Sequence, residues 1–271
     1  MEVKNYKDED YRTIFGVEKN TFDKMVEIIK AKYDIEHQNG GRKDGASPQE
    51  RVEITLKYCR QYLSQRYIVH EYGVAKSCIS PIIKWTLKIL VKDYNFSLPK
   101  KTDNIFDKSE DRIDDATESR IDRPKKNQED WYSGKKGMHT IKTQIEIGVK
   151  TLLIYSIAFA KGSVHDFKLF KNSSCDYNKD TILYIDKGYI GIEKIHANSI
   201  IPIKSSKYHP LTEDEKWYNV EVSKIRIAVE HVNAFLKKFK IISTRFRNRR
   251  KGFKLFMSFI CGIYNFETAN R

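Results

Sequence analysis

The sequence is poor in residues that cross-link a fold or bind soft metals. It has four cysteines among 271 residues, and no two of them form a CxxC pair. None of the seven histidines belongs to an HxH or HxxxH pair, so the spacing argues against a zinc site built from them. We expect reduced cysteines in a reducing compartment, and a hard ion on carboxylates if a metal is used. The cysteines are Cys59, Cys78, Cys175 and Cys261.

Long hydrophobic runs are also missing. The longest apolar stretch, Leu152 to Ala160, is about half a membrane span and contains Ser156. The N-terminus, MEVKNYKDEDY, is polar and predicts no secretory leader. We therefore expect a cytoplasmic protein that has no membrane partner.

Acidic residues are outnumbered by basic ones. The chain has 50 Lys and Arg residues against 36 Asp and Glu, which gives a net charge of +14. This excess favours a polyanionic partner, and nucleic acid is the first candidate. A hydrophobic content of 40% allows a chain of this length to build a core without cross-links.

The N-terminal third has helical patterns. Ser47, Pro48 and Glu50 form a capping box with proline at the first helical position. Residues 64–90 then contain two helical patterns joined at Gly73, and the second has lysines along one face. This order is typical of a helix-turn-helix, although an ordinary helical hairpin explains it equally well. The lysines that would contact DNA are Lys84 and Lys88.

Pro81 lies inside the second of these patterns. In mid-helix, proline removes a backbone hydrogen bond at a cost of about 3 kcal/mol. If Ser77 caps the helix, Pro81 falls just within the first turn and the cost is smaller. We predict a helical DNA-binding domain of residues 1–95, a linker of residues 96–106, and a second domain of residues 107–271.

The second domain has the pattern of an α/β fold. Residues 113–121 have strand character, and residues 141–147 alternate apolar with polar side chains, which predicts a half-buried strand. Residues 152–160 are more continuously apolar and predict a central strand, so the three strands would form a meander. The apolar strand TILYI then ends at Asp186, and open α/β sheets place functional residues at such strand ends.

Residues 223–239 form a predicted helix with two stripes. Arg226, Glu230, Asn233 and Lys237 recur at steps of four, three and four, which stacks them along one helix face. A neighbouring apolar stripe would seat the helix on a core. One carboxylate is therefore presented between two cations.

A basic run follows this helix and includes Phe246 among its arginines. It predicts an arm that contacts phosphates, and a solubilising loop is the alternative. The arginines are Arg245, Arg247, Arg249 and Arg250.

Acidic residues occur on the first predicted strand of the second domain, after the fourth strand and on the closing helix. In a sheet of this order, these elements can converge at one edge. Crowded carboxylates repel one another unless a divalent cation neutralises them. In a basic DNA-binding protein such a site suits two-metal phosphodiester cleavage, in which one Mg²⁺ activates a water or 3′-hydroxyl and the other stabilises the leaving oxygen.

Six segments, in this order, resemble the motifs of DDE-superfamily transposases. They are DATESRIDRP, YSGKKGMHTIKTQ, GSVHDFKLF, DKGYIG, IIPIK and the R-x3-E-x6-K signature that begins at Arg226. The nearest group is the bacterial insertion-sequence family five, which is related to the eukaryotic Harbinger transposases. The resemblance covers nearly the whole chain. It implies an α/β, RNase H-like catalytic domain with a mixed sheet flanked by helices, preceded by a small all-α helix-turn-helix domain.

The resemblance also implies a DDE triad that uses Mg²⁺ or Mn²⁺. Asp115 stands at the aspartate of the D-x-T-E motif, Asp186 at that of DKGY, and Glu230 at the glutamate of the signature. The three would be catalytic residues and metal ligands. Arg226 and Lys237 would contact DNA phosphates near the cut, Lys187 and Tyr189 would shape the site around Asp186, and His165 and Asp166 are second-tier candidates.

Two positions near these motifs leave alternatives open. Asp114 stands where the family has an apolar residue, and a one-residue shift along a strand changes the face on which a side chain lies. Only the resemblance separates Asp115 from Asp114. For Asp166, the position at a helix start also predicts an N-cap, in place of a direct catalytic role.

The function implied by the resemblance is transposition. The protein would bind the terminal inverted repeats of its element, cleave double-stranded DNA at the ends and join the 3′-hydroxyls to target DNA. It would be nucleoid-associated and would act as a homo-oligomer assembled on DNA. Two alternatives remain: a DNA-binding regulator or defective copy without catalysis, and a nuclease without sequence preference.

Overall fold

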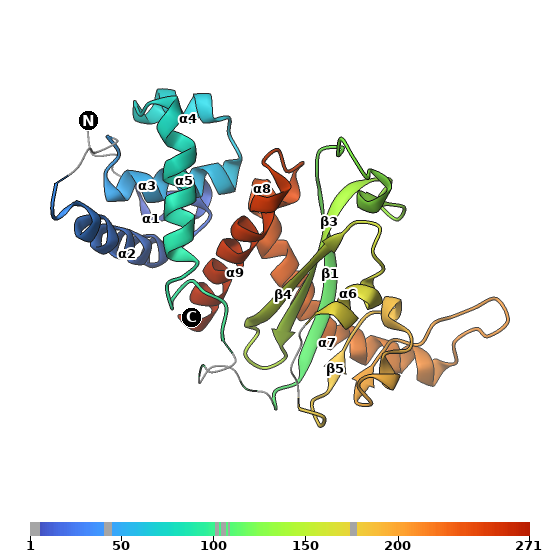
Figure 1. Ribbon diagram of the computed structural model, residues 1–271. Coiled ribbons are helices and arrows are strands. Elements are labelled where there is room, and N and C mark those ends of the chain that lie inside the picture. The colour runs from blue at the N-terminus through green and yellow to red at the C-terminus, as the bar shows by residue number, and fades with distance from the viewer. Residues whose placement is uncertain (1–5, 41–44, 101–102, 104–106, 108, 174–177) are drawn as a thin grey trace. The chain divides into compact units, whose positions relative to one another are not determined.

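The structure is a computed structural model that describes residues 6–40, 45–100, 103, 107, 109–173 and 178–271 (Figure 1). The chain divides into two compact units, one containing Met1–Ser97 with Leu236–Arg271 and the other Leu98–Phe235. The first division lies inside the predicted linker. Sequence order places residues 236–271 in the second domain, whereas in the structure they belong to the helical unit.

The helical unit begins its third α-helix where the sequence predicts. Ser47 Oγ accepts a hydrogen bond from the Glu50 N–H at 3.2 Å, and the Ser47 N–H donates to Glu50 Oε2 at 2.8 Å, which completes the capping box. The helices of this unit are α1 (Asp8–Asp10), η1 (Tyr11–Phe15), α2 (Lys19–His37), α3 (Pro48–Gln61), α4 (Gln65–Tyr72), α5 (Lys76–Leu90), α8 (Lys240–Ser243), η5 (Arg250–Gly252) and α9 (Phe253–Ala269). None of the described helices is both long and apolar enough to cross a membrane.

Helices α4 and α5 are joined at Gly73, as predicted. Gly73 has a φ of 65°, a left-handed conformation that glycine adopts without strain, and its N–H bonds to the Val69 carbonyl at 2.8 Å. Ser77 is not the cap of α5, because the helix already begins at Lys76 after Ala75. Pro81 therefore lies in the second turn of α5, where it removes one helical hydrogen bond.

Three of the cysteines can be described. Cys59, Cys78 and Cys261 have free thiols, as expected. Burial raises the pKa of Cys59 and of Cys261, so neither is a reactive thiolate at neutral pH. Cys175 lies outside the described residues.

The second unit is built on a mixed sheet, in agreement with the predicted α/β class. Strand β1 pairs antiparallel with β3 and parallel with β5, and β3 pairs antiparallel with β4. Strands β1, β3 and β4 therefore form the predicted meander. The strands are β1 (Arg112–Arg120), β2 (Tyr132–Ser133), β3 (Met138–Gly148), β4 (Ile154–Lys161), β5 (Leu183–Tyr184) and β6 (Ser199–Ile200).

The order of the strands corrects one prediction. The main path runs β4-β3-β1-β5-β6, with β2 pairing the start of β3, so β1 is in the middle and β4 is at one side of the described sheet. The prediction of a central strand at residues 152–160 is wrong. Its apolar run reflects packing of Ile154 and Tyr155, while residues 156–160 are half-buried.

The polar side chains of β3 are buried, so the predicted half-buried strand is also wrong. Lys142, Gln144 and Glu146 are 9%, 2% and 2% exposed. The matching face of β1 supplies their partners: Arg112 Nε donates to Glu146 Oε1 at 3.2 Å, and Gln144 Nε2 donates to Asp114 Oδ1 at 3.1 Å. Hydrogen-bonded polar groups can be buried at little cost. In β3 the alternation of apolar and polar residues therefore does not correspond to an alternation of buried and exposed side chains.

Helices α6 (Asp166–Asn172) and α7 (Glu213–Lys237) lie on opposite faces of this sheet (Figure 1). Asp115 of β1 is bonded to α7, whereas Lys142 of β3 is bonded to α6. Lys142 lies opposite Glu118 of β1, and residues 115 and 118 point to opposite faces because strand side chains alternate.

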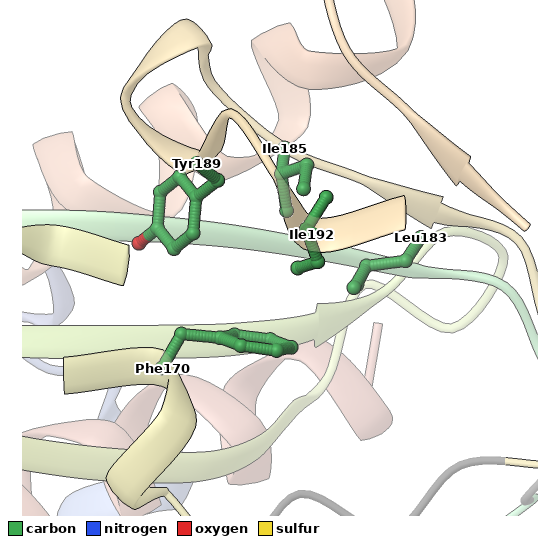
Figure 2. Packing of buried hydrophobic residues seen from close by; sticks show 5 residues of the cluster. All are labelled: Phe170, Leu183, Ile185, Tyr189 and Ile192. Carbon is green, nitrogen blue, oxygen red and sulfur yellow. The ribbon is translucent and has the colours of Figure 1, made fainter. Parts of the chain in front are cut away.

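An apolar cluster supports the segment that follows β5. Figure 2 shows Phe170 of α6 packed with Leu183, Ile185, Tyr189 and Ile192, which are all buried. The Tyr189 ring meets the Phe170 ring edge-on at 6.0 Å between centroids. The residues between Ile185 and Tyr189 are therefore held at the end of a buried strand.

Candidate functional site

Two aspartates lie level with each other at neighbouring strands, Asp115 on β1 and Asp186 two residues after the end of β5. β1 and β5 are parallel, with Arg112 opposite Leu183 and Ile113 opposite Tyr184. Continued by two residues, this register puts Asp115 level with Asp186, which follows β5. Both carboxylates therefore stand near the carboxyl end of β5, as the sequence predicted for Asp186.

Helix α7 contacts both of these aspartates. Arg226 Nη1 lies 3.4 Å from Asp186 Oδ1, and Asn233 Nδ2 donates a hydrogen bond to Asp115 Oδ2 at 2.9 Å. Arg226 and Asn233 are seven residues apart, which is about two helical turns and keeps them on one face. The same face of α7 therefore touches both strand ends.

Glu230 lies between the two contacting residues of α7. It follows Arg226 by four residues and precedes Asn233 by three, so it shares their face. Its side chain is exposed. The structure thus places Glu230 on the side of α7 that looks toward Asp115 and Asp186.

The helix is seated by the predicted apolar stripe. Val229, Val232 and Leu236 are 1%, 0% and 1% exposed. These residues lie beside the polar face rather than opposite it, so burial of the stripe also fixes the direction of Arg226, Glu230 and Asn233. That geometry follows from the 3.6-residue period alone.

The environment of Asp115 disfavours its ionised form. Burial raises the pKa of the Asp115 carboxyl, and the neighbouring Asp186 adds to this effect. The Arg226 guanidinium, the Ala116 N–H and the Asn233 amide all act in the opposite direction. Asp115 is thus a carboxylate that a further positive charge would stabilise.

The donor set fits a hard divalent cation in part. Carboxylate and amide oxygens are the ligands that Mg²⁺ and Mn²⁺ prefer. Besides the carboxylates, Asn233 Oδ1 is buried and has no hydrogen-bond partner among the described residues. Within the same described residues, no group of three or more His, Cys, Asp or Glu side chains is close enough to hold an ion. Asp115 and Asp186 are close enough to interact, and a site that also includes Glu230 would require that side chain to move toward them.

Asp114 does not share this site. Its side chain lies on the other face of β1, is 0% exposed and accepts from Gln144. Asp115 is the residue of the pair that meets α7. The geometry thus separates two aspartates that the residues alone left open.

The second-tier residues fall into two groups. His165 and Lys187 are exposed, and His165, not Asp166, is the N-cap of α6, so the N-cap predicted for Asp166 is off by one residue. Asp166 is the first residue of α6 and its Oδ1 pairs with Lys142 Nζ at 2.8 Å. Tyr189 is 1% exposed, so it shapes the interior rather than a surface.

The predicted DNA contacts of the helical unit are mostly exposed. Arg247 is also exposed, but its guanidinium bonds to the Tyr62 carbonyl and lies 4.1 Å from the centre of the Tyr62 ring. Lys237 is the exposed last residue of α7, and the division of the chain into two compact units puts it in the helical unit. The other exposed residues are Lys84, Lys88, Arg245, Arg249 and Arg250.

Sequence reasoning missed the role of Asn233. It belongs to the predicted stripe of α7, but an amide carries no charge and no chemistry was assigned to it. Its spacing from Glu230 was the available signal, since residues three apart on a helix point the same way.

Comparisons with known proteins agree with this geometry. Residues 115–265, more than half of the chain, match the family described as DDE superfamily endonuclease. A relative from Microchaete diplosiphon, named as a probable transposase for insertion sequence element IS702, is 37% identical over 261 residues, which cover 96% of this chain and 94% of that protein. No solved structure matches the chain.

Proposed function

The chain belongs to the DDE superfamily of endonucleases and is a DDE-family transposase, and from that premise we propose how it acts on DNA. It binds the terminal inverted repeats of its insertion element, cleaves the DNA at the element ends and transfers the 3′-hydroxyls into target DNA. The RNase H-like fold, the membership of insertion-sequence family five, association with the nucleoid and a homo-oligomer assembled on DNA belong to the same proposal.

The observation that supports the proposal best is the meeting of two strands and one helix. Asp115 and Asp186 are level on neighbouring strands, and each contacts α7. Glu230 lies on α7 between the residues that make those contacts. Asp115 and Asp186 thus meet the face of α7 that carries Glu230, although the three acids are far apart in sequence. A metal-dependent nuclease needs such a group of carboxylates.

We assign Asp115, Asp186 and Glu230 as the ligands of Mg²⁺ or Mn²⁺. When bound, a pair of such ions would activate the attacking water or 3′-hydroxyl and stabilise the leaving oxygen. The Asn233 amide holds Asp115 through Oδ2. Asn233 therefore orients the ligand and does not replace it.

Arg226 has two tasks in this proposal. In the structure its guanidinium lies beside Asp186 and also favours the ionised form of Asp115. A DNA phosphate brings the negative charge that a guanidinium binds well. Arg226 would turn to that phosphate near the cut once other positive charge neutralises the aspartates, and Lys237 would bind a phosphate farther along the strand.

The helical unit supplies the remaining DNA contacts. Exposed lysines of α5 and exposed arginines of the loop before α9 provide positive charge that duplex phosphates attract. We assign α4 and α5 as the helix-turn-helix that reads the terminal repeat. Pro81 lies in the second turn of α5, so the residues that read bases would come from the first turn or from its exposed lysine face.

Cleavage of element-end DNA tests this function. Purified protein is incubated with duplexes that carry the end sequence, or a scrambled sequence, with Mg²⁺ or with EDTA. We expect Mg²⁺-dependent nicks at the ends, little cutting of the scrambled duplex, and loss of cutting in Asp186→Asn and Glu230→Gln. Lys161→Met, which changes an exposed residue of β4, is the matched control and should cut as the parent does.

The same assay separates the other possible functions. Salt-dependent binding without metal-dependent cutting would indicate a DNA-binding regulator or a defective copy. Equal cutting of both duplexes would indicate a nuclease without sequence preference. Parental activity in either acid variant would contradict the assigned triad.

A further inference from the structure

A partly buried ion pair lies on the face of the sheet opposite α7, where the Asp166 side chain is 27% exposed. Lys142 Nζ is 2.8 Å from Asp166 Oδ1 and 4.0 Å from Glu118 Oε1. The Lys142 and Glu118 side chains are 11% and 7% exposed. One lysine thus bridges a carboxylate of the central strand and a carboxylate at the start of α6.

Glu118 is itself held by neutral donors. Ser133 Oγ donates to Glu118 Oε1 at 3.1 Å, and Thr140 Oγ1 donates to Glu118 Oε2 at 2.6 Å. Glu118 and Lys142 are directly opposite in the pairing of β1 with β3. The lysine is therefore fixed at its sheet end, and its ammonium has a defined position from which to hold Asp166.

The other carboxylate oxygen of Asp166 lies against the turn that carries Asp186. A Cβ atom built on Gly188 would be 3.7 Å from Asp166 Oδ2, so the turn runs close to that carboxylate with room for no more than a small side chain between them. The next residue of α6 lies similarly close to the chain after this turn, since a Cβ atom built on Gly191 would be 3.6 Å from the Phe167 ring. The start of α6 therefore lies close to the chain at both glycines.

Tyr189 completes this packing from the turn itself. Its ring lies on the apolar cluster, and Figure 2 shows its hydroxyl pointing away from the other labelled side chains. The hydroxyl is buried and has no hydrogen-bond partner among the described residues. Its ring meets Phe170 of α6, so Tyr189 lies on the same side of the sheet as the Lys142 ion pair.

Each of these residues belongs to one of the motif segments but is not a member of the triad. Glu118 follows the first aspartate in DATE, Lys142 lies in HTIKTQ, Asp166 ends GSVHD, and Tyr189 ends DKGY. The structure brings the four segments together behind the site. Asp186 thus has Arg226 of α7 on one side and a turn that packs on α6 on the other.

We propose that Lys142 is a positioning residue for the cleavage reaction. Through its ion pair with Asp166, it holds the start of α6 against Gly188 and so fixes the turn that carries Asp186. Lys142 touches neither DNA nor the reacting atoms in this role. The inference rests on the proposed function for its effect on rate, while the packing it describes can be tested without activity.

Geometry explains why such a residue matters. The turn that carries Asp186 follows a β5 ladder of only two residues, so strand pairing holds it weakly. A displacement of about 1 Å at a reacting centre can reduce a rate by about 100-fold. The Lys142 and Asp166 side chains are 11% and 27% exposed, so water screens this 2.8 Å ion pair less than it screens a fully exposed one.

The test compares Lys142→Met with Lys161→Met in the full-length protein. Methionine keeps much of the length of the lysine and removes its charge. Lys161 also makes a short ion pair, 2.7 Å to Asp130 Oδ2, but both partners are about half exposed, so its loss should change little. Hydrogen exchange of the peptide covering residues 183–192 is measured in metal-free buffer, and single-turnover cleavage of element-end DNA is measured against Mg²⁺ concentration.

We expect faster exchange of this peptide in Lys142→Met by about 10-fold, because local opening governs exchange. Cleavage should slow by about 10- to 100-fold, with a higher Mg²⁺ requirement, while metal-free DNA affinity stays within about 2-fold, because positioning is lost and phosphate contacts are not. Lys161→Met should match the parent in every measurement.

A double variant distinguishes two causes of an effect in Lys142→Met: loss of positioning, and an Asp166 carboxylate left without its partner. Lys142→Met leaves the partly buried carboxylate of Asp166 without its partner, and Asp166→Asn in the same chain removes that charge. We expect the double variant to regain thermal stability while exchange at residues 183–192 stays fast and cleavage stays slow. Recovery of both exchange and cleavage to parental values would overturn the proposal, as would parental exchange in Lys142→Met. If the parent does not cut DNA at all, the proposed function fails, and the exchange comparison still decides the role of Lys142.

Discussion

Asn233 donates a hydrogen bond from Nδ2 to Oδ2 of Asp115 across 2.9 Å, and this contact joins the longest described helix to the central strand. Its own Oδ1 is buried without a partner among the described residues. Neutral amides that hold a carboxylate in place affect metal binding without carrying charge.

Replacement of Asn233 by leucine should weaken metal binding. Leucine has a similar size but no donor, so Asp115 loses the group that orients it. We expect Mn²⁺ affinity to fall by about 10-fold or more, the range found when such supporting hydrogen bonds are lost. Calorimetric titration with Mn²⁺ measures this, and His231→Gln, at an exposed position of the same helix, is the control. Unchanged affinity in Asn233→Leu would show that Asp115 needs no support from α7.

Replacement of Arg226 by glutamine should separate metal affinity from cleavage. The Arg226 guanidinium lies beside Asp186 and favours the ionised form of Asp115. Without its positive charge, the two aspartates would attract a metal cation more strongly. We expect tighter Mn²⁺ binding by about 3- to 10-fold, together with cleavage that is slower by about 100-fold because a transition-state contact to phosphate is lost. Weaker Mn²⁺ binding in Arg226→Gln would contradict the electrostatic role given to this residue.

A pH effect is expected in the helical unit at Glu267 of α9. Its carboxylate accepts from the Glu18 N–H at 2.8 Å, yet burial raises its pKa. A raised folded-state pKa means that stability is highest when the carboxyl is protonated, and is lost as pH rises from the unfolded value near 4.3 through the folded value. Glu267→Gln should therefore unfold at a higher temperature than the parent at pH 7, with the difference vanishing near pH 3.5. Thermal melts at both pH values check this, and a lower melting temperature at pH 7 would contradict it.

Gly262→Ala should destabilise the helical unit. The added Cβ would lie 1.9 Å from the Phe96 carbonyl oxygen, and backbone cannot move aside as easily as a side chain. We expect a loss of about 1–3 kcal/mol in the free energy of unfolding, as for other overpacked sites. Gly134→Ala is the matched control, because a Cβ atom there meets nothing within 4 Å. Equal denaturation midpoints for the two variants would rule out the close contact.

The sequence predicted the parts of this fold that depend on local chemistry. The capping box at Ser47, the turn at Gly73 and the stripes of α7 follow from capping, left-handed glycine and the helical period, which act within a few residues. Asp186 was placed correctly at the end of a buried strand for the same reason.

The failures came from pairings that local patterns do not encode. The order of β4 and β3 depends on which strands meet, and the burial of Lys142, Gln144 and Glu146 depends on partners on β1 that are distant in sequence. The grouping of residues 236–271 with the N-terminal helices is of the same kind. Likewise, the choice between Asp114 and Asp115 rested on the family resemblance in the sequence, and the structure adds that Asp115 contacts α7 while Asp114 lies on the other face of β1.

Cleavage by Asp115→Asn and Asp114→Asn in one single-turnover assay tests the central claim most directly. Asp115 meets α7 beside Asp186, whereas Asp114 lies on the other face, where asparagine can keep the bond to Gln144. We predict that Asp115→Asn loses Mg²⁺-dependent cutting of element-end DNA by about 1,000-fold or more, since metal activation is worth several kcal/mol, and that Asp114→Asn stays within about 10-fold of the parent. Loss of cutting in Asp114→Asn with near-parental cutting in Asp115→Asn would contradict the site described here.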